Sequence, residues 1–462
     1  MVGVSDRLAA FCTGDVASRL TPEVRVDVRR ALVDFCGVAL AGSTLPSAEV
    51  LRRSFSPPDG AASVATTIIG RPERGWAPVA ALANGASAHS IELDDAHAES
   101  SLHPGAVVFP AALAAAEVMG ASGEQFIIAV AAGYEAMVRV GLWLTPGALF
   151  ARRYHPTGVC GAYGAAAATG VILGLRAEQL SEAFGIASDL SVGLMDFGES
   201  GSWNKRLHTG WPAHAGYLAA VMAFEGFRGS REIFTSPSGV LFAFTGDREP
   251  KAAAVPEPGE PLAVQQILYK RHACCRFGHT ALDILLDLRQ THRLAADDVA
   301  EIRIGLIRDG MFLGRPAELK RNPRSMVDAQ FSMQYAAAVA LVKGRTSLPE
   351  FREDVISDPV VRGLMERIEV EHVPALDAVY PKAFPARVEL RTRDGRRWSE
   401  ERWETVGDPA QPLSEAELRS KFETLAGLAV PPHRVRAIVD AVSRVETKEG
   451  PAWLAASLRG GA

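Results

Sequence analysis

Apolar residues recur at helical spacing through most of the first 260 residues of the chain. Thr21 and Pro22 form a typical helix start, the apolar positions behind them repeat every three or four residues, and Gly42 provides a stop. Similar patterns predict further helices at about 78–93, 107–120, 123–142, 158–175, 178–192 and 211–226. Because alternating apolar and polar positions are scarce here, we expect an all-α region.

The pattern changes after residues 247–261, a stretch rich in Pro, Glu and Ala that we interpret as a connecting loop. Alternation at residues 302–306 and 388–390 predicts two half-buried strands. Asp394-Gly395 follows the second strand and is the dipeptide favoured by tight hairpin turns. This part of the chain is therefore predicted to contain a sheet.

Helices are expected among these strands near residues 329–343 and 358–367, with a further strand at about 368–373. The tail returns to helical patterns from Leu413 and again after Pro432. The fold class we predict is mainly α. Its large all-α helical domain is built from both chain ends, 1–266 and 403–462, and a smaller α+β lid domain spans 267–402.

Composition narrows the class of protein. Hydrophobic residues make up 48% and charged residues 22% of the 462 residues, which is typical of a folded globular protein. The net charge of −5 leaves no basic surplus for a phosphate backbone, so we expect no nucleic-acid partner.

Three sequence features indicate where in the cell the protein is expected: the cysteines, the N-terminus and the apolar runs. The five cysteines are sparse and odd in number, and no signal peptide is apparent, so a cytoplasmic protein is expected. The uncharged run 156–175 is dominated by Gly and Ala, which favours a buried packing helix over a membrane span.

The densest group of reactive side chains lies between a largely apolar helix and Pro104-Gly105. His103 precedes a proline, which disfavours helix, and a histidine on such a loop can act as an acid or base near neutral pH. Helix-end charges with buried structural histidines are one alternative. A metal site is another, but the spacing matches no established ligand motif, so no metal is predicted. The members of this group are His89, Glu92, Asp94, Asp95, His97 and His103.

Two further groups carry cations or a histidine near a glycine-rich segment. His155 stands directly before the Gly/Ala helix, whose positive end attracts carboxylates, although a simple proline turn explains the same motif. Lys205, Arg206 and His208 lie in a glycine-flanked segment that we interpret as a loop. That loop is either a solvated surface or a clamp for carboxylates.

Lys270 and His279 lie where the helical region passes into the mixed one, and clefts between domains are favoured ligand sites. Cys274 and Cys275 stand between them, and an adjacent pair without a clear base is more often structural than nucleophilic. Tyr335, at a helix start, is either a core residue or a pocket hydroxyl.

In their order along the chain these segments resemble the MmgE/PrpD family, which includes 2-methylcitrate dehydratases, cis-aconitate decarboxylases and iminodisuccinate epimerase. The resemblance spans nearly the whole chain and implies a cofactor-free homodimer with a helical domain and an α+β lid. The segments that carry it are Asn84-Gly85-Ala86, His89-Ser90, Asp94-Asp95, His103-Pro104, His155-Pro156-Thr157-Gly158, Ser191 to Leu194, Gly201-Ser202, Lys205 to His208, Gly210, Lys270 to His279, Phe331-Ser332, Tyr335 and Leu413 to Phe422.

The resemblance also implies roles for individual residues. The family's two pocket histidines, its loop lysine, its domain-junction lysine and its helix tyrosine fall on His103, His155, Lys205, Lys270 and Tyr335. Asp94 and Asp95, one of which is expected to hold His103 in a single tautomer as carboxylates beside histidines often do, complete the expected catalytic set. The expected substrate-binding residues are Arg206, His208, Glu92 and His279.

The expected function is that of a cofactor-free lyase of the dehydratase type that removes a proton next to a carboxylate of a small polycarboxylate. In decarboxylase-like members the acidic segment reads Asp-aromatic-Asp-Asp-Thr, whereas here Glu92 and Ala96 stand at its two ends. That departure keeps three alternatives open: an isomerase or epimerase, a decarboxylase, and a family member that binds a carboxylate without turnover.

Overall fold

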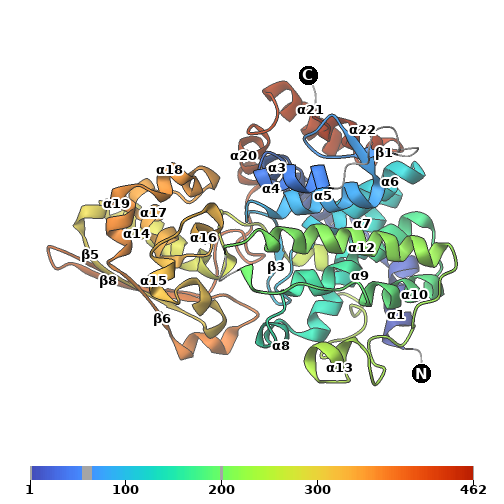
Figure 1. The fold of residues 1–462 in the computed structure, drawn as a ribbon, viewed down its shortest axis with the longest axis horizontal. Coiled ribbons are helices and arrows are strands. Elements are labelled where there is room, and N and C mark those ends of the chain that lie inside the picture. Colours follow the sequence, from blue (N-terminus) through green and yellow to red (C-terminus); the bar gives the residue numbers. More distant parts are fainter. Residues whose placement is uncertain (1–2, 55–64, 198–200, 461–462) are drawn as a thin grey trace.

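In a computed structural model that describes residues 3–54, 65–197 and 201–460, a helical body lies beside a smaller lobe that contains a four-stranded sheet (Figure 1). The prediction of a mainly α fold with a small α+β part is confirmed. The residues at which the two domains divide, 266/267 and 402/403, stay a prediction.

Every helix predicted in the first 260 residues is present, with its ends shifted by a few residues. The largest shift is in α12, which begins at Asn204 instead of residue 211. Lys205, Arg206 and His208 therefore lie in the first turns of a helix, and the loop that we expected there is wrong. The elements of this part are α1 (Val4–Ala10), η1 (Phe11–Asp15), α2 (Val16–Ser18), α3 (Pro22–Ser43), α4 (Pro46–Ser54), α5 (Ala77–His89), α6 (Gly105–Met119), α7 (Gly123–Leu144), α8 (Pro146–Ala151), α9 (Pro156–Leu173), α10 (Ala177–Ser188), α12 (Asn204–Phe224) and α13 (Val240–Thr245).

The C-terminal end of the chain returns to the helical body. Helices α20 (Glu415–Ala426), α21 (Pro432–Ser443) and α22 (Gly450–Leu458) lie beside the N-terminal helices α3 to α6 (Figure 1). Helix α20 packs closely on α3, because Gly37 leaves room for Phe422, whose Cα lies 3.3 Å from where a Cβ on Gly37 would be. Both chain ends therefore contribute to the same helical layer.

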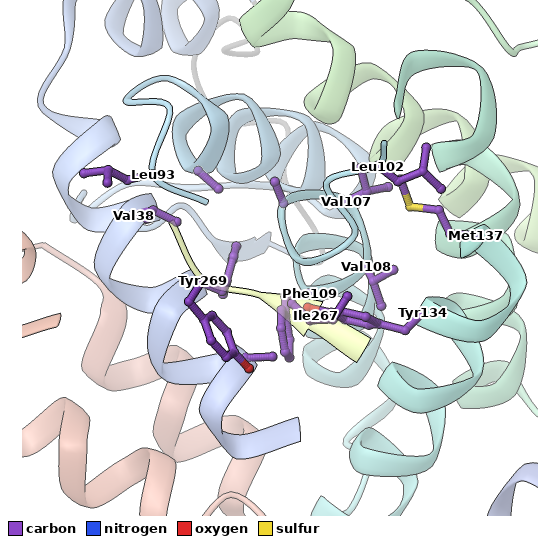
Figure 2. Close-up of a cluster of buried hydrophobic side chains, with 14 of the residues drawn as sticks. Val38, Leu93, Leu102, Val107, Val108, Phe109, Tyr134, Met137, Ile267 and Tyr269 are labelled. Atoms are coloured by element: carbon purple, nitrogen blue, oxygen red, sulfur yellow. The ribbon is translucent and has the colours of Figure 1, made fainter. Parts of the chain in front are cut away.

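Two central helices, α7 and α9, are long and apolar enough to cross a membrane, but 89% of each apolar window is buried inside the fold. Their close packing depends on glycine: a Cβ on Gly164 would lie 2.8 Å from the carbonyl oxygen of Gly133. Neighbouring core side chains come from α3, α6, α7 and the strand β4, among them Phe109, Tyr134 and Ile267 (Figure 2). Burial against other helices accounts for the Gly/Ala composition of α9.

We expect Gly164→Ala to lower the free energy of unfolding by about 1–3 kcal/mol, because the new methyl would lie 2.7 Å from Cβ of Met137 and overpack the contact between α7 and α9. Denaturant unfolding measures the change. The control is Gly363→Ala in α19 (Pro359–Met365), where a Cβ meets no atom within 4 Å. If both variants are equally stable, the packing argument is wrong.

The lobe is built on a sheet with strand order β6-β5-β7-β8, in which β5 and β6 are parallel and the other pairs antiparallel. The predicted hairpin turn is confirmed, with Gly395 at φ +91° between β7 and β8. Helices α14 (His279–His292) and α17 (Met333–Lys343) pack against the sheet. The strands are β5 (Val299–Leu306), β6 (Ile368–His372), β7 (Ala386–Thr392) and β8 (Arg397–Arg402), and the shorter helices are α15 (Ala317–Lys320), α16 (Met326–Gln330), α18 (Glu353–Ile356) and α19.

A short two-stranded ladder joins the lobe to the acidic segment of the helical body. Strand β3 (Ala96–His97) pairs antiparallel with β4 (Ile267–Leu268). Because Asp94 stands two residues before β3 and Lys270 two residues after β4, the register places the acidic segment opposite the domain-junction lysine. A second small ladder, β1 (Ala65–Thr67) with β2 (Arg74–Trp76), lies in the helical body.

Candidate active site

A small cavity of about 60 Å³ lies where the helical body meets the lobe. The helical body contributes Glu92, His103, His155 and Lys205 to its polar lining, and the segment after β4 contributes Lys270. All five side chains belong to the predicted site, although they come from segments spread over almost 180 residues of sequence. The fold therefore brings the main sequence-predicted residues to one enclosed place.

His103 is held in a single tautomer by acceptors on one side of its ring. Its Nδ1 lies 2.9 Å from the backbone carbonyl oxygen of Asp95 and 3.2 Å from Oδ2 of Asp94. Neither acceptor carries a proton to donate, so Nδ1 carries the hydrogen and Nε2 keeps its lone pair. Burial lowers the pKa of His103 to about 4, although Asp94 opposes the shift. His103 is therefore a neutral imidazole with a free basic nitrogen at neutral pH.

The backbone around His103 is fixed by the N-terminus of α9. The hydroxyl of Thr157 accepts a hydrogen bond of 3.2 Å from the His103 backbone amide. His155 is the residue before α9, as the sequence predicted, and its amide donates to the carbonyl of Gly193 at 2.9 Å. The first turn of α9 thus positions both pocket histidines.

Four imidazoles form a cluster at the cavity, and two of them, His103 and His155, line it. The His89 ring centroid lies 4.6 Å from that of His103, and the His155 centroid lies 5.3 Å from that of His208. His89 donates from Nδ1 to the carboxylate of Asp94 at 2.7 Å, and burial lowers the pKa of His89 against the opposing charge of Asp94. Nδ1 of His155 and Nδ1 of His208 are 3.3 Å apart, so one of them donates to the other. His208 is therefore a support for His155, and it does not line the cavity.

His89, His103 and His155 are the residues whose spacing comes nearest to a metal site within the described ranges. One ring nitrogen from each lies within 4.8 Å of the other two. Histidine is a common ligand of zinc, at about 2.0–2.1 Å. The sequence prediction of no metal is therefore best tested with a chelated sample.

Glu92 forms ion pairs with both lysines of the site. Its carboxylate contacts Nζ of Lys205 through one oxygen and Nζ of Lys270 through the other, at 3.1 Å for the second pair. Burial raises the pKa of Glu92, but the two ammonium groups outweigh burial and hold it well below its usual range. Glu92 has φ +55°, in the left-handed region that non-glycine residues rarely adopt. The lysines expected to hold substrate carboxylates are thus already neutralised by the chain itself.

The segment that carries Glu92 is anchored from the C-terminal helix. Lys421 of α20 donates to the carbonyl of Leu93 at 2.7 Å and pairs with the buried Asp34 of α3 at 2.5 Å. A residue more than 300 positions away along the chain therefore fixes the acidic turn.

Asp95 plays a different part from Asp94. Its carboxylate accepts from the hydroxyl of Tyr134 at 2.7 Å and from the amide of Gly105 at 2.9 Å, and burial raises its pKa to about 7. It contributes to the site through its backbone carbonyl, which fixes His103. The carboxylate of Asp94 is the one that faces the histidines.

Six expected site residues do not line the cavity: Asp94, Asp95 and His208, described above, and three others. Tyr335 donates its hydroxyl to the carbonyl of Glu350 at 2.5 Å and is fully buried in the lobe, so it is a core residue. Arg206 turns toward α4 and donates to the hydroxyl of Ser47 at 2.6 Å. His279 begins α14 with its Nε2 3.1 Å from the carbonyl oxygen of Cys274. We correct the roles expected for Tyr335, Arg206 and His279 accordingly.

Two features of the cavity escaped the sequence reasoning. One is Arg276, which is among the residues that line the cavity. It belongs to the segment between Lys270 and His279, so its position was the signal that could have found it. The other is a wall of phenylalanines, for which no local signal exists: Phe150, Phe197, Phe277, Phe312, Phe331 and Phe384.

Buried neutral histidines make the stability depend on pH. Burial lowers the pKa of His97 and His103 to about 4 and of His208 to about 3, and likewise lowers those of His89, His155 and His279. Unfolded histidines titrate near 6.5, so between about 4 and 6.5 the unfolded chain binds more protons and stability falls as the pH is lowered. The pKa of Asp95 is raised to about 7, so its carboxyl binds a proton in the folded chain over this pH range and opposes the trend.

We therefore expect the free energy of unfolding to fall by more than about 1.4 kcal/mol per pH unit between pH 6.5 and 5. Urea unfolding at a series of pH values measures the slope. His97→Gln removes one histidine that takes up a proton on unfolding, so it should reduce the slope by about 1.4 kcal/mol per pH unit. The exposed His433→Gln should leave the slope unchanged. A stability that is constant or rises toward pH 5 would contradict the burial of neutral histidines.

Comparison with known proteins covers almost the entire chain. Residues 6–253 match the MmgE/PrpD N-terminal domain, and residues 272–447 match the MmgE/PrpD C-terminal domain. The chain is 28% identical to the cis-aconitate decarboxylase-like protein oryM of Aspergillus oryzae, over 99% of this chain and 97% of that protein. It is 28% identical to the cis-aconitate decarboxylase of Aspergillus terreus, over 95% and 92% of the two chains. It is 25% identical to the cis-aconitate decarboxylase of Homo sapiens, over 99% and 95%.

Proposed function

Since the chain belongs to the MmgE/PrpD family, we propose that it is a lyase that acts on a small polycarboxylate by removing a proton next to a carboxylate. The observation that carries this proposal is His103, a buried histidine whose Nδ1 is held by two acceptors and whose Nε2 is free at the cavity. A base fixed in this way meets the geometric requirement for proton abstraction. Loss of water would then complete a dehydratase reaction.

In this reaction Nε2 of His103 takes the proton from the carbon beside a substrate carboxylate, and the electron pair of that C–H bond spreads into the carboxylate. The ammonium group of Lys270 stabilises the charge that develops in the buried site. The anionic substrate also raises the basicity of His103 when it binds. The chain's own cations thus supply the stabilisation.

The leaving hydroxyl needs a proton, and the pair His155–His208 supplies it. When Nδ1 of His208 donates to Nδ1 of His155, the remaining proton of neutral His155 is on Nε2. His155 lines the cavity and His208 does not, so His155 is the donor to the substrate. The electron pair released from the C–H bond forms the C=C bond, and the electron pair of the C–O bond leaves with the hydroxyl, which departs as water.

Decarboxylation is the second candidate, and two observations favour it. The relatives reported above are named cis-aconitate decarboxylases or decarboxylase-like. The cavity also has a largely aromatic wall, and loss of carbon dioxide is favoured where a carboxylate loses its water shell. In this reaction the C–C bond pair stays on carbon, which then takes a proton, so His103 has to enter the reaction protonated.

The pH dependence of kcat/KM separates the two candidates, because it reports the pKa of the free enzyme. With the pKa of His103 at about 4, a mechanism that needs the free base gives a kcat/KM that is constant between pH 5 and 8. A mechanism that needs protonated His103 gives a kcat/KM that falls tenfold per pH unit over the same range. Initial rates with a fixed, subsaturating substrate measure it.

Proton NMR in heavy water, with chelated protein and citrate, 2-methylcitrate, cis-aconitate or iminodisuccinate, tests the function itself. Loss of water supports the proposal, and loss of carbon dioxide supports the second candidate. Exchange of the proton next to the carboxylate without elimination identifies an isomerase or epimerase. Complete inactivity with all carboxylates, including those named in the next subsection, would overturn the lyase proposal.

A further inference from the structure

Arg276 is a buried cation with unused hydrogen-bond donors at the cavity. Its side chain is 7% exposed, and its Nη2 donates to both oxygens of Asp408 at 2.7 Å. Its Nε and Nη1 are buried and have no hydrogen-bond partner among the described residues. Buried donors are almost always paired in proteins, so these two point to a ligand that accepts from them. Arg276 also lies over the ring of Phe384 at 4.9 Å, which fixes its plane.

The two lysines of the site offer no comparable free charge. Glu92 bridges Lys205 and Lys270, and it is itself only 4% exposed. A substrate carboxylate on the lysine pair would have to displace a carboxylate that the chain already holds there. The turn that carries Glu92 is tied to α20 through Lys421, which opposes such a displacement.

The remaining wall of the cavity is aromatic, with side chains from both the helical body and the lobe, including Phe150, Phe277 and Phe331. Phenyl rings donate no charge-assisted hydrogen bond to a carboxylate, so a carboxylate placed against them would lose its hydration without compensation. An alkyl or aryl group placed there would instead be stabilised by burial. Phe150 and Phe331 also line a larger neighbouring cavity of about 780 Å³, which gives room for such a group beside its apolar residues. The lining of that cavity also includes charged residues, among them Arg308, Asp309 and Arg315.

We infer that the substrate is a dicarboxylate that carries an alkyl or aryl substituent, with one carboxylate on Arg276 and the substituent against the phenylalanine wall. Glu92 occupies the place where a third carboxylate would bind to the lysine pair. The chain thereby selects against substrates of the citrate type with three carboxylates. This inference rests on the proposed function for the reacting carbon beside His103, and it adds the substrate class and Arg276 as a specificity residue.

Calorimetric binding to the full-length, chelated protein tests the substrate class with three probes. Phenylmaleate carries two carboxylates and an aryl group, maleate lacks the aryl group, and cis-aconitate carries three carboxylates. We expect phenylmaleate to bind at least tenfold more tightly than maleate or cis-aconitate. Equal or tighter binding of cis-aconitate would overturn the inference, as would the absence of binding by all three probes.

The variant Arg276→Gln tests the contact. We expect phenylmaleate affinity to fall about tenfold to a hundredfold, since hydrogen bonds to a charged partner contribute about 1.5–3 kcal/mol. The control is Arg271→Gln, five residues earlier in the same segment, whose side chain is 49% exposed and does not line the cavity. If Arg276→Lys and Arg276→Gln both keep the affinity of the parent, Arg276 does not bind the substrate and the inference fails.

The variant Glu92→Gln tests the selection against three carboxylates. Loss of its negative charge should improve the affinity for cis-aconitate relative to phenylmaleate by about tenfold or more. An unchanged ratio between the two probes would contradict the role of Glu92. Glu92→Asp, which keeps the charge, should keep the ratio.

Turnover in the same samples separates this inference from the proposed function. Loss of water from citrate, or of carbon dioxide from cis-aconitate, that depends on His103 and not on Arg276 supports a lyase and overturns the inference. Binding of phenylmaleate that depends on Arg276, with no turnover of any substituted dicarboxylate or tricarboxylate, supports the inference and overturns the lyase proposal.

Discussion

Replacement of His103 by glutamine is expected to lower kcat by about 10²–10⁴-fold, the usual contribution of a positioned acid or base. Glutamine keeps a donor for the carbonyl of Asp95 but has no basic nitrogen to receive a proton. The loss should therefore appear in kcat at every pH between 5 and 8. Steady-state rates with the substrate identified by NMR measure it, and circular dichroism checks that the fold is intact.

The choice of control for His103 follows from burial. His97 is the nearest other histidine in sequence, but it is buried and lines the cavity, so its replacement does not isolate the role of His103. His433 in α21 is exposed and lies outside the cavity, and His433→Gln should retain the activity of the parent. A His103→Gln enzyme with more than a tenth of the parent kcat would remove His103 from the mechanism.

Replacement of Glu92 by alanine is expected to lower the free energy of unfolding by about 3–5 kcal/mol, the usual cost of removing one partner of a buried ion pair. Both Lys205 and Lys270 would remain buried at the cavity without the carboxylate that each now contacts. Thermal and denaturant unfolding measure the loss. It should shrink as the pH rises toward about 10.4, where both lysines lose their charge in the unfolded chain.

A matched control is Glu423→Ala in α20, which removes an exposed pair with Arg419 on the same helix face. Such pairs contribute only a few tenths of a kcal/mol. In addition, acetate should raise the melting temperature of Glu92→Ala more than that of the parent, because a small carboxylate can enter the vacated place between the lysines. A loss for Glu92→Ala no larger than that for Glu423→Ala would show that the ion pairs contribute little to the fold.

Much of the helical architecture follows from local patterns. Thr21 caps α3 through its side chain, and the apolar repeat behind it faces the core, as the sequence predicted. The sheet hairpin at Gly395 is equally local, because a tight turn with a positive φ favours glycine. Helix ends were less well predicted: residues 91–95 continue the pattern of α5 but form a loop, since the long-range ladder between β3 and β4 takes over there.

Some residues of the candidate site could likewise be predicted from local sequence, whereas the positions of others depend on packing. Sequence motifs pointed to His103, His155, Lys205 and Lys270, because these reactive residues lie in short segments that carry the family resemblance. Tyr335 stood out for the same reason, but the direction of a side chain on a helix depends on what packs around it. Its hydroxyl is used by the carbonyl of Glu350.

By itself the sequence determined the helical periods, the family resemblance and the group of histidines, lysines and acids, since each of these is written in neighbouring residues. Only the tertiary structure decided that Glu92 neutralises both lysines, that Arg276 has free donors and that phenylalanines far apart in sequence form one wall. The physical reason is that charge balance and burial are properties of contacts between distant segments. The pattern along the chain determines the helices, strands and reactive side chains of each segment. The packing of the lobe against the helical body determines which distant side chains each of them contacts.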